Sequence, residues 1–178
     1  MIRKARFGDI DSIVKIYDHI LSQEEQGTAR VGWLRGVYPT RDTAMTALEA
    51  GDLFVLELEG RVAAAGRINR EPVDVYAQCP WKYPAPPEQV MVLHTLVVEP
   101  ALSGRGLATR FVQFYEDYAR EQGCPFLRMD TNARNAAARR LYKGLGYWEA
   151  AILPTVFNGI SGVELVCLEK YLDKKTDG

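Results

Sequence analysis

The sequence predicts an α/β fold in which helices pack on a mixed β-sheet. Apolar residues at helical spacing alternate along the chain with short apolar runs typical of strands, and turn signals separate the two kinds of segment. The chain has 178 residues, of which 47% are hydrophobic and 25% charged, as in an ordinary globular protein. We therefore expect a single domain over residues 1–178.

The first half of the chain is predicted to form a short strand, two helices and a β-hairpin, over residues 2–5, 9–27, 40–51, 53–58 and 62–68. Asp9 and Thr40 fit N-cap positions, because a side-chain oxygen there can bind the free N–H groups of the first helical turn. In the first helix, apolar residues recur every three or four positions. Glu59-Gly60 fits the tight turn of the hairpin.

A proline-rich and aromatic-rich insert, at about residues 71–89, interrupts this pattern. Its prolines stand among Tyr76, Trp81 and Tyr83. Proline at this density cannot continue a central strand or helix, because it lacks the amide hydrogen and fixes the backbone. We expect an ordered loop that lies over the core; a solvated excursion is the alternative.

The second half is predicted to alternate strands and helices, over residues 90–98, 107–123, 126–129, 135–145, 147–153 and 163–168. Pro100 ends the first of these strands, and Gly123 ends the helix that follows. Gly146 fits the residue after the second helix, and Asn158-Gly159 joins the last two strands.

Composition excludes several classes of protein. The net charge is −1, whereas nucleic-acid binders usually carry a basic excess. Three scattered cysteines and two histidines argue against a disulfide framework or a metal site. Residues 1–6 carry no apolar signal core, and no stretch approaches the roughly 18 apolar residues of a membrane span. We therefore expect a cytoplasmic protein without a nucleic-acid, membrane or metal partner.

The most informative segment is a loop that follows a buried strand and opens a helix. It consists of Ser103, Gly104, Arg105, Gly106, Leu107, Ala108 and Thr109. Its glycines let backbone N–H groups converge on one anion, and the helix start adds free N–H groups and a positive dipole end. Arg105 adds a cation. The pattern predicts a phosphate-binding loop; a glycine-rich turn without a ligand is the alternative.

A dinucleotide site of an oxidoreductase is a further alternative for this loop. Asp130 even ends the next strand about where a ribose-binding acid would lie. However, Thr109 stands at the third glycine position, and residues 99–103 separate the strand from the first glycine. A P-loop is excluded, because no Gly-Lys-Ser/Thr follows.

Two segments resemble motifs of the GNAT acetyltransferase superfamily. Residues 103–108 resemble its R/Q-x-x-G-x-G/A motif, although Ser103 replaces the usual Arg or Gln. Residues 135–147, Asn-Ala-Ala-Ala-Arg-Arg-Leu-Tyr-Lys-Gly-Leu-Gly-Tyr, are similar to its N-x-x-A-x-x-L-Y-x-x-x-G-[FY] segment. The element order resembles that fold from the first strand to the last. The resemblance implies a mostly antiparallel sheet, splayed at an acetyl-CoA site, and acetyl transfer to an amine.

The resemblance also implies roles for individual residues. The backbone of Leu96, Val97 and Val98 would bind the pantetheine and the acetyl carbonyl, and residues 103–109 the pyrophosphate. Asn135 would bind the pantetheine region. Tyr142 would point at the thioester sulfur and act as general acid; a tyrosine packed in the core is the alternative.

The general base is left open between two residues and a relay through water. Strand alternation predicts that Val92, His94, Leu96 and Val98 share one face, where His94 is the only titratable side chain. The alternative for His94 is a buried histidine held by a hydrogen bond. Asp130, at the end of the neighbouring strand, is the second candidate.

The acceptor pocket is expected to form from the first helix region and the insert. Its candidate residues are Trp33, Arg35, Tyr38, Tyr76, Trp81, Tyr83 and Asp130. Aromatic rings suit an apolar or cationic acceptor, and Arg35 favours one that carries a carboxylate; ordinary packing is the alternative. We expect a small amine or an amino-acid-like acceptor, with a protein amine or a non-catalytic acyl-CoA sensor as alternatives, and a monomer or homodimer.

Overall fold

The computed structural model describes residues 1–173, so the last five residues of the expected domain lie outside the described part. It contains seven strands, β1 (Ile2–Lys4), β2 (Leu53–Leu58), β3 (Arg61–Asn69), β4 (Val90–Val98), β5 (Phe126–Asn132), β6 (Trp148–Phe157) and β7 (Ile160–Tyr171). They form one sheet in the order β1-β2-β3-β4-β5-β7-β6, and only the β4–β5 pair is parallel. The expectation of a mixed, mostly antiparallel sheet is confirmed.

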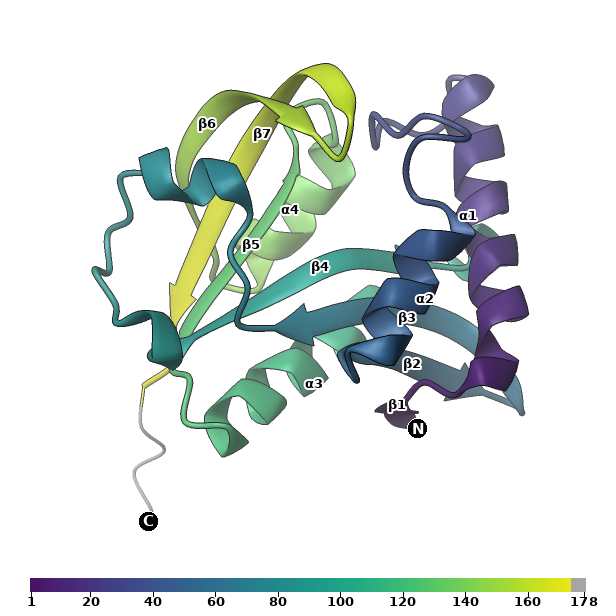
Figure 1. Ribbon diagram of the computed structural model, residues 1–178, viewed down its shortest axis with the longest axis horizontal. Coiled ribbons are helices and arrows are strands. Elements are labelled where there is room, and N and C mark those ends of the chain that lie inside the picture. The colour runs from purple at the N-terminus through teal and green to yellow at the C-terminus, as the bar shows by residue number, and fades with distance from the viewer. Residues whose placement is uncertain (174–178) are drawn as a thin grey trace.

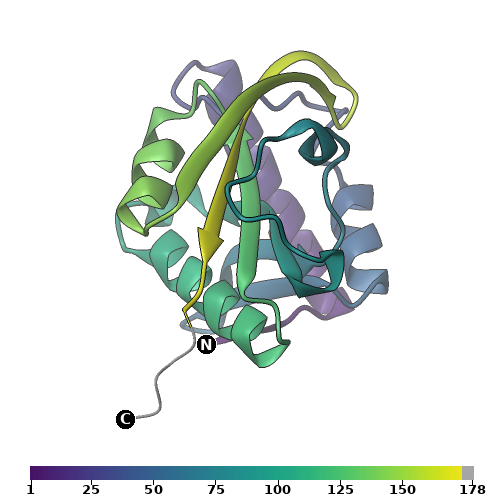
Figure 2. The same ribbon diagram turned by 90° about the vertical axis from the view of Figure 1, so that its left-hand side faces the viewer.

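Helices cover both faces of this sheet. They are α1 (Ile10–Glu25), α2 (Arg41–Glu49), α3 (Leu107–Glu121) and α4 (Ala136–Gly144), with short 3-10 turns η1 (Phe7–Asp9), η2 (Asp74–Gln78), η3 (Pro87–Gln89) and η4 (Pro100–Leu102). Helices α1 and α2 lie on one face, and α3 and α4 pack on the other (Figures 1 and 2). No helix within residues 1–173 combines the length and the apolar content needed to cross a membrane.

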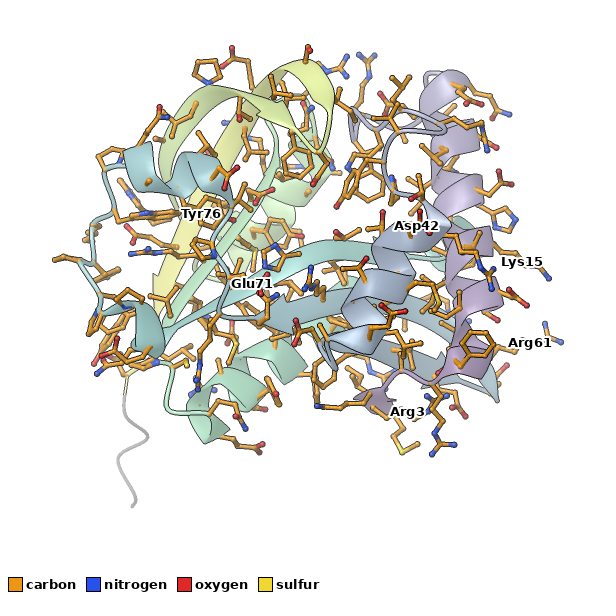
Figure 3. All side chains as sticks on the ribbon, in the orientation of Figure 1. Arg3, Lys15, Asp42, Arg61, Glu71 and Tyr76 are labelled. Carbon is orange, nitrogen blue, oxygen red and sulfur yellow. The ribbon has the colours of Figure 1, made fainter. Side chains whose placement is uncertain are left out.

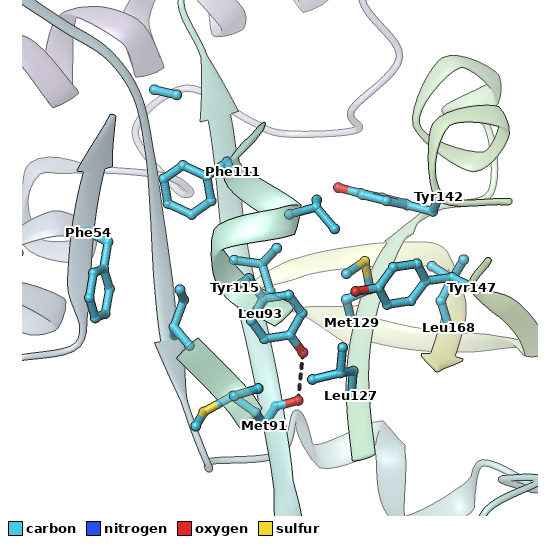
Figure 4. Packing of buried hydrophobic residues seen from close by; sticks show 14 of the residues in the cluster. Phe54, Met91, Leu93, Phe111, Tyr115, Leu127, Met129, Tyr142, Tyr147 and Leu168 are labelled. Atoms are coloured by element: carbon cyan, nitrogen blue, oxygen red, sulfur yellow. Dashed lines mark hydrogen bonds between the residues drawn. The ribbon is translucent and has the colours of Figure 1, made fainter. Parts of the chain in front are cut away.

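The core under α3 fixes the middle of the sheet. Phe111 and Tyr115 of α3 are fully buried against β3, β4 and β5. The hydroxyl of Tyr115 donates a hydrogen bond to the carbonyl of Met91 on β4 at 2.7 Å (Figure 4). A Cβ atom at Gly66 of β3 would lie 2.8 Å from the Phe111 ring, so this close approach requires glycine.

The sheet splays between β4 and β5. These strands pair from Val90 with Phe126 to Leu93 with Met129 and then separate (Figure 1). Beyond that point β4 stays paired with β3, and β5 stays paired with β7. The last residues of β4 therefore present one backbone edge to a gap instead of to a strand, as the resemblance implies.

A bulge interrupts β4 at the start of this gap. Thr95 and Leu96 together stand opposite Gly66 of β3. Thr95 has a φ of 51°, a left-handed value that is uncommon for a threonine. A bulge adds one residue to its strand, so it reverses the alternation of faces beyond it.

The bulge corrects the expectation about which side chains share a face. His94 and Val97 lie on the side of α1 and α2, whereas Leu96 and Val98 pack against the core under α3. The prediction that Val92, His94, Leu96 and Val98 share one face is therefore wrong. The physical reason for this error is the extra residue at the bulge, which the apolar pattern of the strand does not indicate.

The insert of residues 71–89 packs on the sheet as an ordered segment. Glu169 of β7 is 2% exposed and accepts hydrogen bonds from the backbone N–H groups of Lys82 at 2.6 Å and Tyr83 at 3.3 Å. The indole N–H of Trp81 donates to the carbonyl of Tyr76 at 3.0 Å. These bonds hold η2 against strands β5 and β7.

Candidate active site

Two cavities meet beside the splayed strands. The outer cavity, of about 290 Å³, lies between α1, α2, the start of the insert and the β6–β7 hairpin. The gap cavity, of about 140 Å³, lies between the ends of β4 and β5 and reaches α4. Tyr38, Thr95, Asp130 and Phe157 line both cavities. Groups bound in the two cavities would therefore face each other at these residues.

The loop that opens α3 presents a row of free backbone N–H groups. Gly104 and Gly106 have φ values of 77° and 72°, which glycine adopts without strain. The first intrahelical bond is donated by Arg110 to the carbonyl of Gly106. Within residues 1–173, no acceptor binds the N–H groups from Gly104 to Thr109. Together with the positive end of α3, these groups form a site suited to a phosphate.

The side chains of this loop divide into two kinds. Leu107 is buried in the core under α3 and anchors the start of the helix. Ser103 and Arg105 are exposed, and no ion pair involves Arg105 in the described part of the chain. Arg105 is therefore free to pair with a bound anion, while the backbone supplies the other donors.

Tyr142 reaches from α4 into the gap cavity. Its side chain is 8% exposed, and its ring packs edge-on against Tyr147 with 6.1 Å between the centroids. Its hydroxyl points away from α4 toward β4 (Figure 4) and has no hydrogen-bond partner among residues 1–173. Burial, and the nearby carboxyl group of Asp130, raise the pKa of Tyr142 well above its usual range. The phenol therefore stays protonated and available as a donor.

Asn135 stands at the entrance of α4 and lines the gap cavity. Its Oδ1 accepts a hydrogen bond from the N–H of Ala138 at 3.1 Å, which caps the helix. The capping bond uses the amide oxygen, and the amide NH₂ group has no hydrogen-bond partner among residues 1–173.

Asp130 lies at the junction of the two cavities, at the end of β5. Tyr76 donates a hydrogen bond from its hydroxyl to Oδ2 at 2.5 Å, and Oδ1 has no partner among the described residues. Burial raises the pKa of Asp130 to about 6, and the hydrogen bond from Tyr76 opposes this rise. A carboxyl group with a pKa near neutrality suits proton transfer at neutral pH.

His94 lines the outer cavity but not the gap cavity. Its Nε2 lies 2.8 Å from Oδ1 of Asn69, so this nitrogen carries the hydrogen. Burial, and then the positive charge of Arg67, lower the pKa of His94 to about 4. His94 is thus a buried, hydrogen-bonded histidine and a weak base, and the geometry favours Asp130.

The structure brings some of the other expected residues to the cavities. Tyr38 lines both cavities, and its hydroxyl is hydrogen-bonded to that of Thr95. Trp33 lines the gap cavity and packs edge-on against Tyr38, with 5.6 Å between the ring centroids. Tyr76 lines neither of these two cavities and contributes through its bond to Asp130.

Arg35 lies elsewhere, so the expectation that it binds substrate is not supported. Its guanidinium pairs with Asp18 and with Glu25, the latter at 2.7 Å, on the exposed side of α1. Trp81 packs against Tyr76, and Arg128 stacks on its ring at 4.3 Å from the centroid. Trp81 is therefore part of the packing under the insert, the alternative that the sequence left open.

The outer cavity also holds residues that sequence reasoning did not identify. They include Tyr17, Arg67, Glu71, Asp74 and Phe157. A charged residue inside an otherwise apolar strand was a signal for Arg67; the pattern held no signal for Phe157, which the long β6–β7 hairpin brings across. Arg67 is paired with Asp52 at 3.2 Å and with Glu71 at 3.7 Å, so its charge is already balanced.

Known proteins share both the sequence pattern and the fold. The family model described as acetyltransferase (GNAT) family matches residues 15–147. An uncharacterised N-acetyltransferase of Methanocaldococcus jannaschii is 28% identical over 87 residues, which are 48% of this chain. The matched region spans 38% of the length of that curated relative.

Solved structures resemble the whole described sheet and its helices. A GNAT-family acetyltransferase from Streptococcus agalactiae has a TM-score of 0.82 and 21% identity, and the match covers 98% of this chain and 96% of the other. An acetyltransferase from Salmonella typhimurium, solved with its cofactor acetyl-CoA, has a TM-score of 0.70 and 22% identity, covering 100% and 96%. These likenesses establish the fold.

Proposed function

Because this chain belongs to the acetyltransferase (GNAT) family, we propose that it transfers the acetyl group of acetyl-CoA to a primary amine. The observation that carries the proposal is the meeting of the two cavities at Asp130, with Tyr142 on the far side of the gap. We assign residues 1–178 to one N-acyltransferase domain; its cytoplasmic location and its state as a monomer or homodimer stay predictions.

The gap between β4 and β5 suits acetyl-CoA. The free N–H groups from Gly104 to Thr109 would hold the diphosphate, with Arg105 beside them. The unpaired backbone edge of Leu96, Val97 and Val98 and the amide of Asn135 would bind the pantetheine arm. In this place the sulfur would lie beside the hydroxyl of Tyr142.

Bound acetyl-CoA supplies an activated thioester, and the protein supplies proton transfer and charge stabilisation. A free amine has a pKa of about 10.4 and arrives protonated, but the partly closed cavity disfavours its charge. The free Oδ1 of Asp130 takes the proton. A backbone N–H of β4 in the gap stabilises the negative charge that develops on the carbonyl oxygen.

Tyr142 would protonate the leaving thiolate, and the second proton that the attacking nitrogen loses as the amide forms would return to the Tyr142 oxygen. Its raised pKa keeps the proton on the phenol until the thiolate forms. The same burial disfavours a charged sulfur, so the pKa of the leaving thiol is raised in the same direction as the pKa of the Tyr142 phenol. This matching supports Tyr142 as the general acid.

The outer cavity favours a small amine without a carboxylate group. Its volume of about 290 Å³ suits a small molecule, and Tyr17, Tyr38 and Phe157 offer aromatic surface. Its one lining arginine, Arg67, is already paired with carboxylates. The rim carries the carboxylate of Glu71, labelled in Figure 3, so an apolar or cationic acceptor body is the better fit.

Release of free thiol from acetyl-CoA in the presence of a panel of amines tests this function. We expect turnover with small amines and less with amino acids or peptide N-termini. Acetyl-CoA at 100 times its Kd should stabilise the protein by about 2.7 kcal/mol against unfolding, and NAD should not. Binding without turnover for any amine would favour an acyl-CoA sensor, and stabilisation by NAD alone would favour an oxidoreductase.

The pH dependence of turnover should identify the base. Because the pKa of Asp130 is raised to about 6 and the base must be ionised, kcat should fall as pH decreases through about 6. A histidine base with the pKa of His94, about 4, would keep kcat constant down to much lower pH. Steady-state kinetics at saturating acceptor over pH 4–9 distinguishes the two, and an acidic limb near pH 4 would reject Asp130.

Replacing Gly106 with valine should weaken acetyl-CoA binding about tenfold or more. At a φ of 72° a β-branched residue costs about 1–2 kcal/mol or shifts the backbone, which turns the N–H groups away from the diphosphate. Calorimetric titration with acetyl-CoA measures the change.

Gly27→Val is the matched control, because Gly27 has a φ of 75°, open space around its Cβ position and no place in either cavity. It should lower the melting temperature and leave Kd unchanged. An unchanged Kd for the Gly106 variant would remove the loop from the cofactor site.

A further inference from the structure

The insert reaches the candidate base through one hydrogen bond. The side chain of Tyr76 extends from η2 toward strands β5 and β7 (Figure 3), and its hydroxyl donates a hydrogen bond to Oδ2 of Asp130 at 2.5 Å. Tyr76 is 2% exposed and lines neither cavity. It therefore touches Asp130 from behind, on the side away from the expected substrates.

Packing and hydrogen bonds surround Tyr76 in this position. Its ring packs edge-on against Trp81, with 5.2 Å between centroids, and its carbonyl accepts the Trp81 indole N–H. Trp81 in turn lies under the guanidinium of Arg128, which comes from the same strand as Asp130. Buried Glu169 binds the two backbone N–H groups that follow Trp81.

We propose that Tyr76 is a positioning residue, which binds one oxygen of Asp130 and turns the other toward the junction of the two cavities. The inference rests on the proposed role of Asp130 as the base. It assigns a purpose to the proline-rich insert: the insert carries a phenol to the back of the reacting carboxylate. Tyr76 itself touches neither acceptor nor acetyl-CoA.

The bond has a defined effect on the ionisation of Asp130. Burial raises the pKa of Asp130, and the donated hydrogen bond lowers it, because it stabilises the charged form. Among the described residues, the other titratable groups that face this region are the phenols of Tyr17, Tyr38 and Tyr142, the thiol of Cys167 on β7, and His94, Arg67, Glu71 and Asp74 around the outer cavity. None of these groups is hydrogen-bonded to the Asp130 carboxylate; among the described residues, only Tyr76 is.

Tyr76→Phe removes the donor and keeps the ring. A hydrogen bond to a charged group is lost, so the pKa of Asp130 should rise by about one unit or more. The shift is measured by carbon-13 NMR titration of the Asp130 carboxyl group, which needs no activity. The acidic limb of kcat should move upward by the same amount, and KM for acetyl-CoA should stay constant.

The orientation of the Asp130 carboxylate is tested at a pH above the pKa of Asp130 in both wild type and Tyr76→Phe. At pH 9, where Asp130 is ionised with or without Tyr76, kcat of Tyr76→Phe should remain several-fold below wild type, because the carboxylate can rotate. Tyr83→Phe is the matched control from the same insert. The ring of Tyr83 packs against Phe126 and Tyr171, so Tyr83 lines neither cavity and the expectation that it borders the acceptor is not supported. Its hydroxyl has no hydrogen bond within residues 1–173, so neither the titration nor kcat should change.

A second substitution covers the case in which Tyr76→Phe does not fold. Incorporating 3-fluorotyrosine at position 76 makes the phenol a stronger donor, so it should lower the pKa of Asp130. Unchanged titration of Asp130 in either variant would overturn the inference. If the titration shifts but wild-type protein releases no thiol with any amine, the contact stands as structural, and it is the proposed function that fails.

Discussion

Asp130→Asn should reduce kcat by about 10²–10⁴-fold, the usual contribution of a general base. Asparagine keeps the size of the side chain, and its oxygen can still accept the hydrogen bond from Tyr76. It cannot take a proton from the amine. Because the backbone of the α3 loop dominates cofactor binding in this account, Kd for acetyl-CoA should stay nearly unchanged.

His94→Asn provides the comparison for this result. His94 borders the acceptor side only and is held by Asn69, so its replacement should raise KM for the amine more than it lowers kcat. Stopped-assay kinetics and calorimetric titration on both variants give the changes in kcat, in KM for the amine and in Kd for acetyl-CoA relative to wild type. The reverse outcome, with full kcat in Asp130→Asn and a collapse in His94→Asn, would assign the base to His94.

Tyr142→Phe should lower kcat by about 10²-fold, at the lower end of the range for general acids, because water in the gap can supply part of the proton. The packing of the ring against Tyr147 is retained, so stability should change little. The defect should shrink when acetyl-CoA is replaced by an acetyl thioester of a more acidic thiol, since that leaving group needs less protonation.

Tyr147→Phe is the matched control for Tyr142. Its hydroxyl donates to Glu116 at 3.1 Å, on the helix side and outside both cavities. Loss of this bond should cost about 1 kcal/mol of stability and leave kcat intact. Equal turnover by wild type and Tyr142→Phe with every thioester would remove the acid role.

Local signals predicted the elements of this fold well. Thr40 opens α2 as expected, and Glu59-Gly60 and Asn158-Gly159 form the two hairpin turns with left-handed φ values. These features depend on residues close in sequence, so caps and turn residues specify them. The order of strands and the splay came from the resemblance, because non-local pairing leaves little trace in local pattern.

Strand ends were predicted less well. Strand β5 continues through polar residues to Asn132, where pairing with β7 holds it extended. Strand β6 includes Pro154, which an edge strand tolerates because no partner needs its missing N–H. Both extensions border the candidate site. Because the prediction followed the apolar pattern, it ended these strands just before the residues that line the cavities.

The candidate site depended on contacts that sequence spacing cannot show. Tyr142 lies on α4 beside the gap cavity and the glycine loop opens α3; spacing could indicate these places in the fold because each motif is a local structure. The contact between Tyr76 and Asp130 joins residues 54 positions apart, and it needs both the insert and the splay. Arg35 was predicted to bind the acceptor because it is a cation near the expected pocket. It instead forms ion pairs with Asp18 and Glu25, two acidic residues about two turns apart on α1.

A crystal structure with bound acetyl-CoA would show whether the backbone of the α3 loop holds the diphosphate. We expect diphosphate oxygens within about 3.2 Å of the N–H groups from Gly104 to Thr109, with the sulfur beside the Tyr142 hydroxyl and the acetyl group facing Asp130. Acetyl-CoA bound in another place, with the α3 loop empty at a saturating concentration, would contradict it.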